Sequence, residues 1–284
     1  MSKNKNRIQI NLPTLIAISI VAWALVDILH EIIGHAGAAF IMGIPVKAVS
    51  TSTAYIIVNW DQFIGEHGLN PIRLFTLGGT IVNIVTGALA LLALKWKKAM
   101  SSTLCYFLWL FASFSMIIVA MNMVTNTLLG FGDWAVFIST LEQENVWKII
   151  IIVVGLLLTV TGYILSLRQW VPNMKGHRLT LLKITAIPVV TVIAVQTLSL
   201  IKSPFAALPP ESNHILASFF AYIHFILWVI VVNLIPGPRS IDNLEAIRLP
   251  PSNFWLVLGL IVFIVFILVL GPGIGSFVGD PRLR

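Results

Sequence analysis

The chain is dominated by apolar runs of about 20 residues, the length that an α-helix needs to cross the hydrocarbon core of a bilayer. Hydrophobic residues make up 58% of the sequence and charged residues only 10%. A mean hydropathy of +0.95 excludes a soluble globular domain. The sequence therefore predicts an all-α polytopic membrane protein.

Seven runs are expected to form transmembrane helices, at residues 13–42, 73–94, 102–126, 147–167, 182–201, 214–236 and 253–270. The first run is too long for one simple span, so its helix is expected to bend or to leave the membrane obliquely. Residues 44–58 alternate in polarity and are rich in β-branched side chains. This pattern predicts a short membrane-associated β-hairpin after the first helix.

The distribution of lysine and arginine predicts the orientation of these helices. With the N-terminus in the cytoplasm, twelve of the eighteen basic residues lie in cytoplasmic segments, as the positive-inside rule requires. These flanking residues also account for the net charge of +7, so no nucleic-acid partner is implied. We therefore expect a multi-pass protein with a cytoplasmic N-terminus, surrounded by membrane lipids.

Four ionisable side chains, those of Asp27, His30, Glu31 and His35, occur in the first apolar run, where a membrane helix normally contains only hydrocarbon. His30, Glu31 and His35 lie within six positions, and polar side chains at such depth usually mark function. In many hydrolases, His-Glu-x-x-His on a helix supplies two zinc ligands and a general base. Here the histidines are five residues apart, which on a regular α-helix turns His35 about 140° away from His30.

Two helix geometries reconcile this spacing with a metal site. A one-turn π-bulge absorbs one extra residue, and Gly34 eases it because glycine has no side chain to clash. A straight helix would instead pair Glu31 with His35, with Asp27 one turn earlier on the same stripe. The remaining interpretation is interhelical hydrogen bonding in a helical bundle that binds no metal.

A third ligand must come from the membrane side on which the histidines lie. Counted from a cytoplasmic N-terminus, His30 and His35 lie in the outer part of the first span. Asp133 follows the outer end of the third span, so the topology allows it to reach them. Asp242 follows the inner end of the sixth span, a membrane thickness away, and is ranked second.

Three stretches carry a resemblance to a known family, and they occur in that family's order within residues 13–140. The first is the histidine motif with the small residues after it, leading into the expected hairpin. The second is the glycine-to-asparagine segment Leu77–Asn83. The third, Asn126–Asp133, looks like a degenerate Asn-x-x-Pro...Asp-Gly motif, with Trp134 where the glycine usually stands. Together they resemble the site-2 protease family of intramembrane zinc metalloproteases.

The resemblance implies a Zn²⁺-dependent endopeptidase that cleaves transmembrane or membrane-associated peptide substrates. It implies that His30, His35 and Asp133 bind the metal, that Glu31 is the catalytic base and that Asn83 steadies the substrate or the oxyanion.

The same resemblance divides the chain into two expected parts. Residues 1–140 would form a metalloprotease-like core of three helices and the hairpin, and residues 141–284 would add transmembrane helices of unknown role. Two other functions stay open on the sequence. One is a metal-dependent membrane hydrolase of another substrate, and the other is a non-proteolytic transporter, scaffold or inactive relative.

Overall fold

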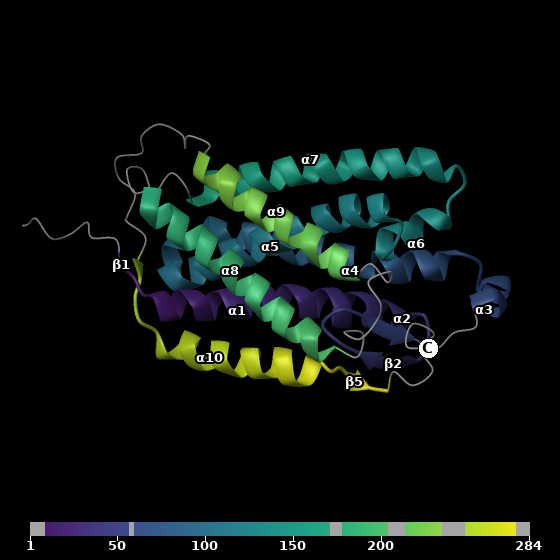
Figure 1. Cartoon of the computed structure of the whole chain (residues 1–284), viewed down its shortest axis with the longest axis horizontal. Helices are drawn as coiled ribbons and strands as arrows, with labels where there is room; N and C mark the ends of the chain where they lie inside the picture. Colours follow the sequence, from purple (N-terminus) through teal and green to yellow (C-terminus); the bar gives the residue numbers. More distant parts are fainter. Residues whose placement is uncertain (1–8, 57–59, 171–177, 204–213, 235–247, 277–284) are drawn as a thin grey trace, which may run out of the picture.

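The computed structural model describes residues 9–56, 60–170, 178–203, 214–234 and 248–276, which are mostly helical (Figure 1). The helices are α1 (Leu12–Ile28), η1 (Leu29–Ala36), α2 (Gly37–Ile41), α3 (Trp60–His67), α4 (Asn70–Ala93), η2 (Leu94–Ala99), α5 (Ser102–Leu129), α6 (Asp133–Ser139), α7 (Glu144–Trp170), α8 (Arg178–Lys202), α9 (His214–Leu234), α10 (Asn253–Ile264) and η5 (Val265–Leu270). The strands are β1 (Gln9–Ile10), β2 (Val46–Val49), β3 (Ala54–Ile56), β4 (Arg248–Leu249) and β5 (Ile274–Gly275). Helices η1 and η5 are π-helices, and η2 is a 3₁₀-helix.

Six helical segments of the described chain are long and apolar enough to cross a membrane: Leu12–Ile41, Asn70–Trp96, Ser102–Leu129, Glu144–Leu165, Leu179–Lys202 and Asn253–Leu270. They correspond to six of the seven expected spans and confirm the polytopic helical fold. The seventh corresponds to α9, whose apolar stretch Tyr222–Leu234 is shorter than the other six. Such a set of helices indicates a multi-pass integral membrane protein.

Polar residues at the helix ends explain where two of the longest helices begin and end. The Asn11 side chain accepts a hydrogen bond from the Thr14 amide at 3.0 Å and so caps the start of α1. The Ser101 hydroxyl accepts one from the Leu104 amide at the start of α5. Helix α5 ends at Gly130, whose left-handed backbone stops the helix just before the loop to α6.

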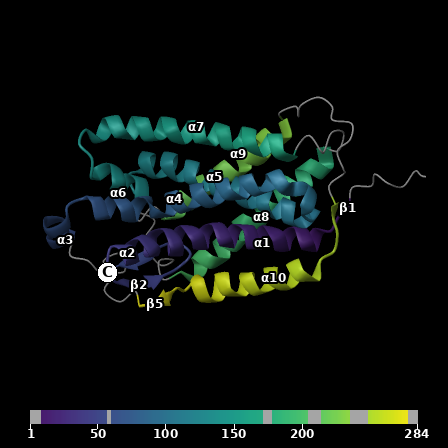
Figure 2. The ribbon, with the colours of Figure 1, turned by 180° about the vertical axis from the view of Figure 1, so that it is seen from behind.

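Helix α1 lies inside the bundle and is covered by helices from both halves of the chain. It packs against α10 on one side and against α5 and α8 on others (Figure 1). Seen from behind, α4 and α5 lie between α1 and α7 (Figure 2). Trp23 of α1 makes edge-to-face contacts with Phe114 of α5 and Phe225 of α9 in the buried core. Described helices from both residues 1–140 and residues 141–284 therefore contribute to the main hydrophobic core.

The expected hairpin after the first helix is confirmed. Strands β2 and β3 pair antiparallel, and β5 from the far end of the chain pairs with the other side of β2, giving the order β3-β2-β5. Ala48 and Tyr55 are buried, and both strands contact η1. A hydrogen bond of 2.6 Å between the hydroxyls of Thr51 and Ser199 ties the hairpin turn to α8. The sheet is thereby held against the helix that carries the histidines.

Candidate metal centre

The histidine motif lies on a π-helix, which resolves the spacing of its two imidazoles. Helix η1 spans Leu29–Ala36, and its i→i+5 hydrogen bonding brings residues five apart onto one face. The Nε2 atoms of His30 and His35 lie 3.3 Å apart, and both side chains are buried. The π-bulge hypothesis is therefore confirmed, and the alternative of a straight helix is wrong.

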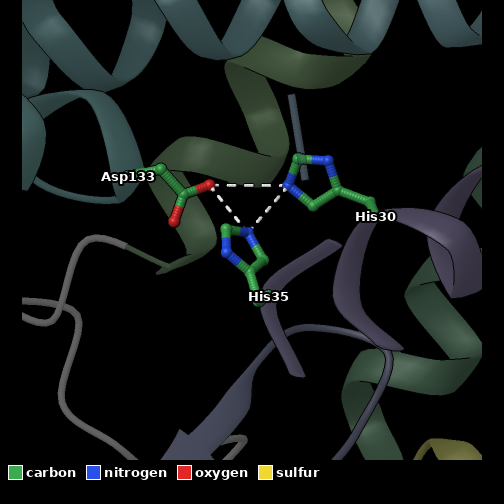
Figure 3. Close-up of side chains that lie close together, drawn as sticks. All are labelled: His30, His35 and Asp133. Atoms are coloured by element: carbon green, nitrogen blue, oxygen red, sulfur yellow. Dashed lines mark hydrogen bonds and ion pairs between the residues drawn. The ribbon is translucent and has the colours of Figure 1, made fainter. Parts of the chain in front are cut away.

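Asp133 completes a triangle with the two imidazoles (Figure 3). Its Oδ2 atom lies 3.4 Å from Nε2 of His30 and 3.2 Å from Nε2 of His35. Among the described residues, these three side chains form a group whose ligand atoms all lie within 4.8 Å of one another, as a metal site requires. Asp242, the second-ranked ligand, lies outside the described residues.

The loop before α6 aims Asp133 at the histidines. Gly132, the N-cap of α6, has φ +77° and ψ −173°, a positive-φ extended conformation that glycine adopts without strain. A Cβ atom at this position would lie 2.6 Å from Nδ2 of Asn126, so the side chain of Asn126 occupies the space that a larger residue would need. Asp133 then begins α6 with its carboxylate directed toward η1 (Figure 3).

Helix α4 packs tightly behind the two histidines. A Cβ atom on Gly34 of η1 would lie 2.4 Å from the Cα atom of Gly79, so the two backbones are nearly in contact. A Cβ atom on Gly79 itself would lie 2.5 to 2.6 Å from three ring atoms of His30. Small residues at such a crossing let membrane helices approach closely. The Leu77–Asn83 segment of α4 therefore packs directly against the helix that carries the two histidines.

A backbone carbonyl of α4 sets the tautomer of His35. Nδ1 of His35 lies 2.7 Å from the carbonyl oxygen of Phe75, and because a carbonyl can only accept, Nδ1–H donates. The neutral ring then carries its free lone pair on Nε2, the atom that faces Asp133 and His30. Metal-binding histidines are commonly oriented by such a bond from their other nitrogen.

Asn83 makes the corresponding contact with His30. It is fully buried, its Nδ2 atom lies 3.2 Å from Nδ1 of His30, and its Oδ1 atom is buried with no hydrogen-bond partner in the described chain. Rotating the carboxamide group of Asn83 by half a turn exchanges the positions of its oxygen and nitrogen atoms. Oδ1 then accepts from Nδ1–H of His30, which satisfies that oxygen and leaves Nε2 for a metal. Contact with the substrate or oxyanion stays a prediction for this residue.

Two further carboxyl groups lie on the same apolar span as the histidines, Asp27 near the end of α1 and Glu31 on η1. Glu31 is half-buried and close enough to His35 and Asp27 to interact with both electrostatically. Asp27 is only 5% exposed, and its Oδ2 atom has no hydrogen-bond partner among the residues described. Glu31 is thus next to the triangle without belonging to it, and its role as general base stays a prediction.

The electrostatics of the triangle favour an ionised Asp133. Burial by itself raises the pKa of this carboxyl group, but a protonated His35 imidazole and the hydrogen bonds that the two imidazoles donate to it when no metal is bound outweigh burial and hold the pKa below its ordinary value. An ionised carboxylate has lone pairs available on both oxygens. Two imidazole nitrogens and one carboxylate oxygen therefore converge as potential ligands.

Sequence reasoning found all three corners of the triangle and missed what supports them. The Phe75 carbonyl belongs to the backbone, so no residue type signals it. The contact between Gly34 and Gly79 could be anticipated in part from the sequence, because each glycine lies in an apolar run beside a polar motif.

Comparisons of the chain with protein-family models, curated proteins and solved structures find no match. The resemblance to site-2 proteases therefore rests on the three sequence motifs and stays a prediction.

Proposed function

We propose that this protein is an intramembrane zinc-dependent endopeptidase that cleaves transmembrane or membrane-associated substrates. The observation that carries the proposal is the triangle of His30, His35 and Asp133, with edges of 3.2, 3.3 and 3.4 Å inside a helical membrane protein. Polar groups at such depth are costly and are kept for function.

The size of the triangle favours zinc over other common cations. A tetrahedral ion with bonds of about 2.0 to 2.1 Å separates its ligand atoms by about 3.3 to 3.4 Å. The same bond length in an octahedron separates neighbouring ligands by only about 2.9 Å, as for magnesium. The observed edges of 3.2 to 3.4 Å fit the tetrahedron. Two nitrogens and one oxygen are also the ligand set of many catalytic zinc sites, which keep one position open.

Each residue near the triangle has a role in peptide hydrolysis. When bound, zinc lowers the pKa of a coordinated water to about 7 and polarises a carbonyl group. Glu31 would accept the proton of the attacking water and deliver it to the leaving amine. His35 and His30 would be held in their metal-binding tautomers by Phe75 and Asn83.

Peptide cleavage also requires an extended substrate, because the amides of a helix are hydrogen-bonded and shielded. Strand β2 is paired on both sides, whereas β3 is paired on one side only among the described residues. An unpaired strand edge binds extended peptides by adding a strand. We propose that the edge of β3, next to η1, holds the unwound substrate.

The proposal includes the orientation of the site. Lysine and arginine are in excess in the segments that lie on the same side of the membrane as the N-terminus, which supports a cytoplasmic N-terminus. The ends of α1 and α5 and the start of α4 then lie at the outer membrane face, together with the hairpin. Reagent labelling of single cysteines in intact cells, introduced in a Cys105→Ser background at exposed positions such as Lys47, would test this.

The zinc content of the purified chain is the first test. We expect about one zinc per chain in the unaltered protein, a loss of zinc in Asp133→Ala and an unchanged content in Asp242→Ala. Loss of zinc only in Asp242→Ala would identify Asp242, and not Asp133, as the third ligand. Absence of zinc in the unaltered protein would favour a non-proteolytic relative.

A cleavage assay separates proteolysis from other hydrolytic chemistry. Membrane-spanning peptides are incubated with the unaltered protein and with Glu31→Gln, which keeps the zinc ligands but removes the proposed base. We expect cleavage by the first and none by the second, with equal zinc in both. Peptide cleavage that survives Glu31→Gln would exclude the proposed mechanism. Bound zinc without any peptide cleavage would favour a hydrolase of another substrate.

A further inference from the structure

Arg73 joins α4, which contacts both histidines of the triangle, to α6, which carries Asp133. It lies in the first turn of α4, and its guanidinium donates from Nε to the hydroxyl of Thr140 at 3.1 Å and from Nη2 to the carbonyl of Thr140 at 2.6 Å. A third, longer contact of 3.4 Å runs from Nη1 to Oδ1 of Asn70 on the same helix. The two contacts with Thr140 match the planar fork of arginine, which lysine cannot reproduce.

Thr140 is the C-cap of α6, the short helix that begins with Asp133. With seven residues, α6 is too short to be stable by itself, and its last carbonyl groups lack helical partners. Arg73 satisfies the Thr140 carbonyl and places a positive charge at the negative end of the helix. The far end of α6 is therefore fixed to α4 by a charged contact.

Apolar packing contributes to this connection, because Leu77 of α4 packs against the cluster that holds α6 on α5, and Arg73 adds a directional polar contact at the far end of α6. Trp134 and Ile138 of α6 pack against Val119 and Met123 of α5, in a buried cluster that fixes the face α6 turns toward α5. The polar link from α6 to α4 runs through Arg73. The residue two positions further along α4, Phe75, receives the hydrogen bond of His35. One end of α4 thus contacts both the histidine helix and the aspartate helix.

We propose that Arg73 is a positioning residue for the metal centre: by bridging α4 to Thr140 it sets the position of α6 and so holds the Asp133 carboxylate at the two imidazoles. This inference rests on the proposed zinc site and adds a residue that touches none of its ligands. Metal ligands tolerate only small displacements, because their distances must stay within about 0.2 Å of the preferred value. A shift of α6 by a fraction of an ångström therefore weakens binding.

The test compares the zinc affinity of purified variants by competition with a chelator. We expect Arg73→Gln to raise the zinc dissociation constant about tenfold or more, within the range known for residues that support metal ligands. Arg73→Lys and Thr140→Val each keep part of the contact and should weaken zinc less. Lys148→Gln, which removes an exposed ion pair with Glu144 on α7, is the matched control and should leave the affinity unchanged.

Cobalt distinguishes a displaced ligand from a general loss of stability. Co²⁺ in place of zinc reports the ligand geometry by its visible absorption, so Arg73→Gln should change this spectrum while Lys148→Gln should not. The double variant Arg73→Gln/Thr140→Val should weaken zinc no more than Arg73→Gln alone, because both changes break one contact.

The outcomes separate this inference from the proposed function. Zinc binding by the unaltered protein, with the same affinity and cobalt spectrum in Arg73→Gln, overturns the positioning role and leaves the zinc site standing. No zinc in the unaltered protein overturns both. If Arg73→Gln does not fold, the zinc affinities of Arg73→Lys and Thr140→Val test the positioning role in its place. An unaltered zinc affinity in both variants overturns the role of Arg73.

Discussion

Alanine at Gly34 should force apart the two helices that build the metal site. The added Cβ atom would lie 2.4 Å from Cα and 2.5 Å from the amide nitrogen of Gly79. An ordinary contact needs at least 3.4 Å, so η1 and α4 must separate by about 1 Å. Both partners are backbone atoms, so no side-chain rotation can relieve the clash.

This separation has a defined cost for stability and for metal binding. Overpacking a tight contact costs about 1 to 3 kcal/mol, whereas replacing glycine by alanine in a helix contributes about 1 kcal/mol of stability. We therefore expect a net destabilisation of up to about 2 kcal/mol. The hydrogen bond from His35 to the Phe75 carbonyl would lengthen from 2.7 Å to about 3.7 Å and break. Loss of this orienting bond should weaken zinc about 10- to 100-fold.

Gly37 provides a matched control on the next helical turn. A Cβ atom there meets nothing closer than 3.7 Å, so Gly37→Ala should be neutral or stabilising and should keep the zinc affinity. Thermal unfolding in detergent and chelator competition measure the two effects on both variants. If Gly34→Ala is as stable as Gly37→Ala and binds zinc equally well, the close contact between η1 and α4 is refuted.

Three other predictions concern the surroundings of the site. Gly132→Ala should abolish zinc binding, because the added Cβ atom displaces the loop before α6. Gly130→Ala is the control: Gly130 has φ +73° but open space around it, so this variant should still bind zinc and should lose only about 1 to 2 kcal/mol of stability to backbone strain. Asn83→Leu should weaken zinc about 10- to 100-fold in chelator competition, and Asn83→Asp, which keeps an acceptor for Nδ1–H, should bind zinc more tightly than the leucine variant. Thr51→Val should lower the free energy of unfolding by about 1 to 3 kcal/mol without changing zinc content, since it leaves the Ser199 hydroxyl buried without its partner. Equal unfolding free energies for Thr51→Val and the unaltered chain would contradict the last prediction.

The membrane fold could be predicted from the sequence because its signal is local. Each span is an apolar run whose length is set by the thickness of the bilayer, and six of the seven runs have the expected character in the structure. Residues 44–58 carried a strand pattern, and β2 and β3 lie within them. The order of the spans also predicted that the two histidines and Asp133 lie at one end of the bundle, because successive spans alternate in direction.

The geometry of the site required the tertiary structure. The spacing of His30 and His35 allowed a π-helix or a straight helix, and the choice depends on how η1 packs against Gly79 of α4. The strand that completes the sheet, β5, comes from more than 200 residues further along the chain than β2.

The sequence by itself determined which residues lie in the membrane and which of them are chemically able to bind a metal. Only the tertiary structure decided that the side chains of His30, His35 and Asp133 meet, that the Phe75 carbonyl and Asn83 contact the imidazoles and that Arg73 contacts Thr140 at the end of α6. Hydropathy depends on the composition of one segment. Distances between side chains depend on the rotation and depth of helices relative to one another, which are set by close packing among residues far apart in the chain.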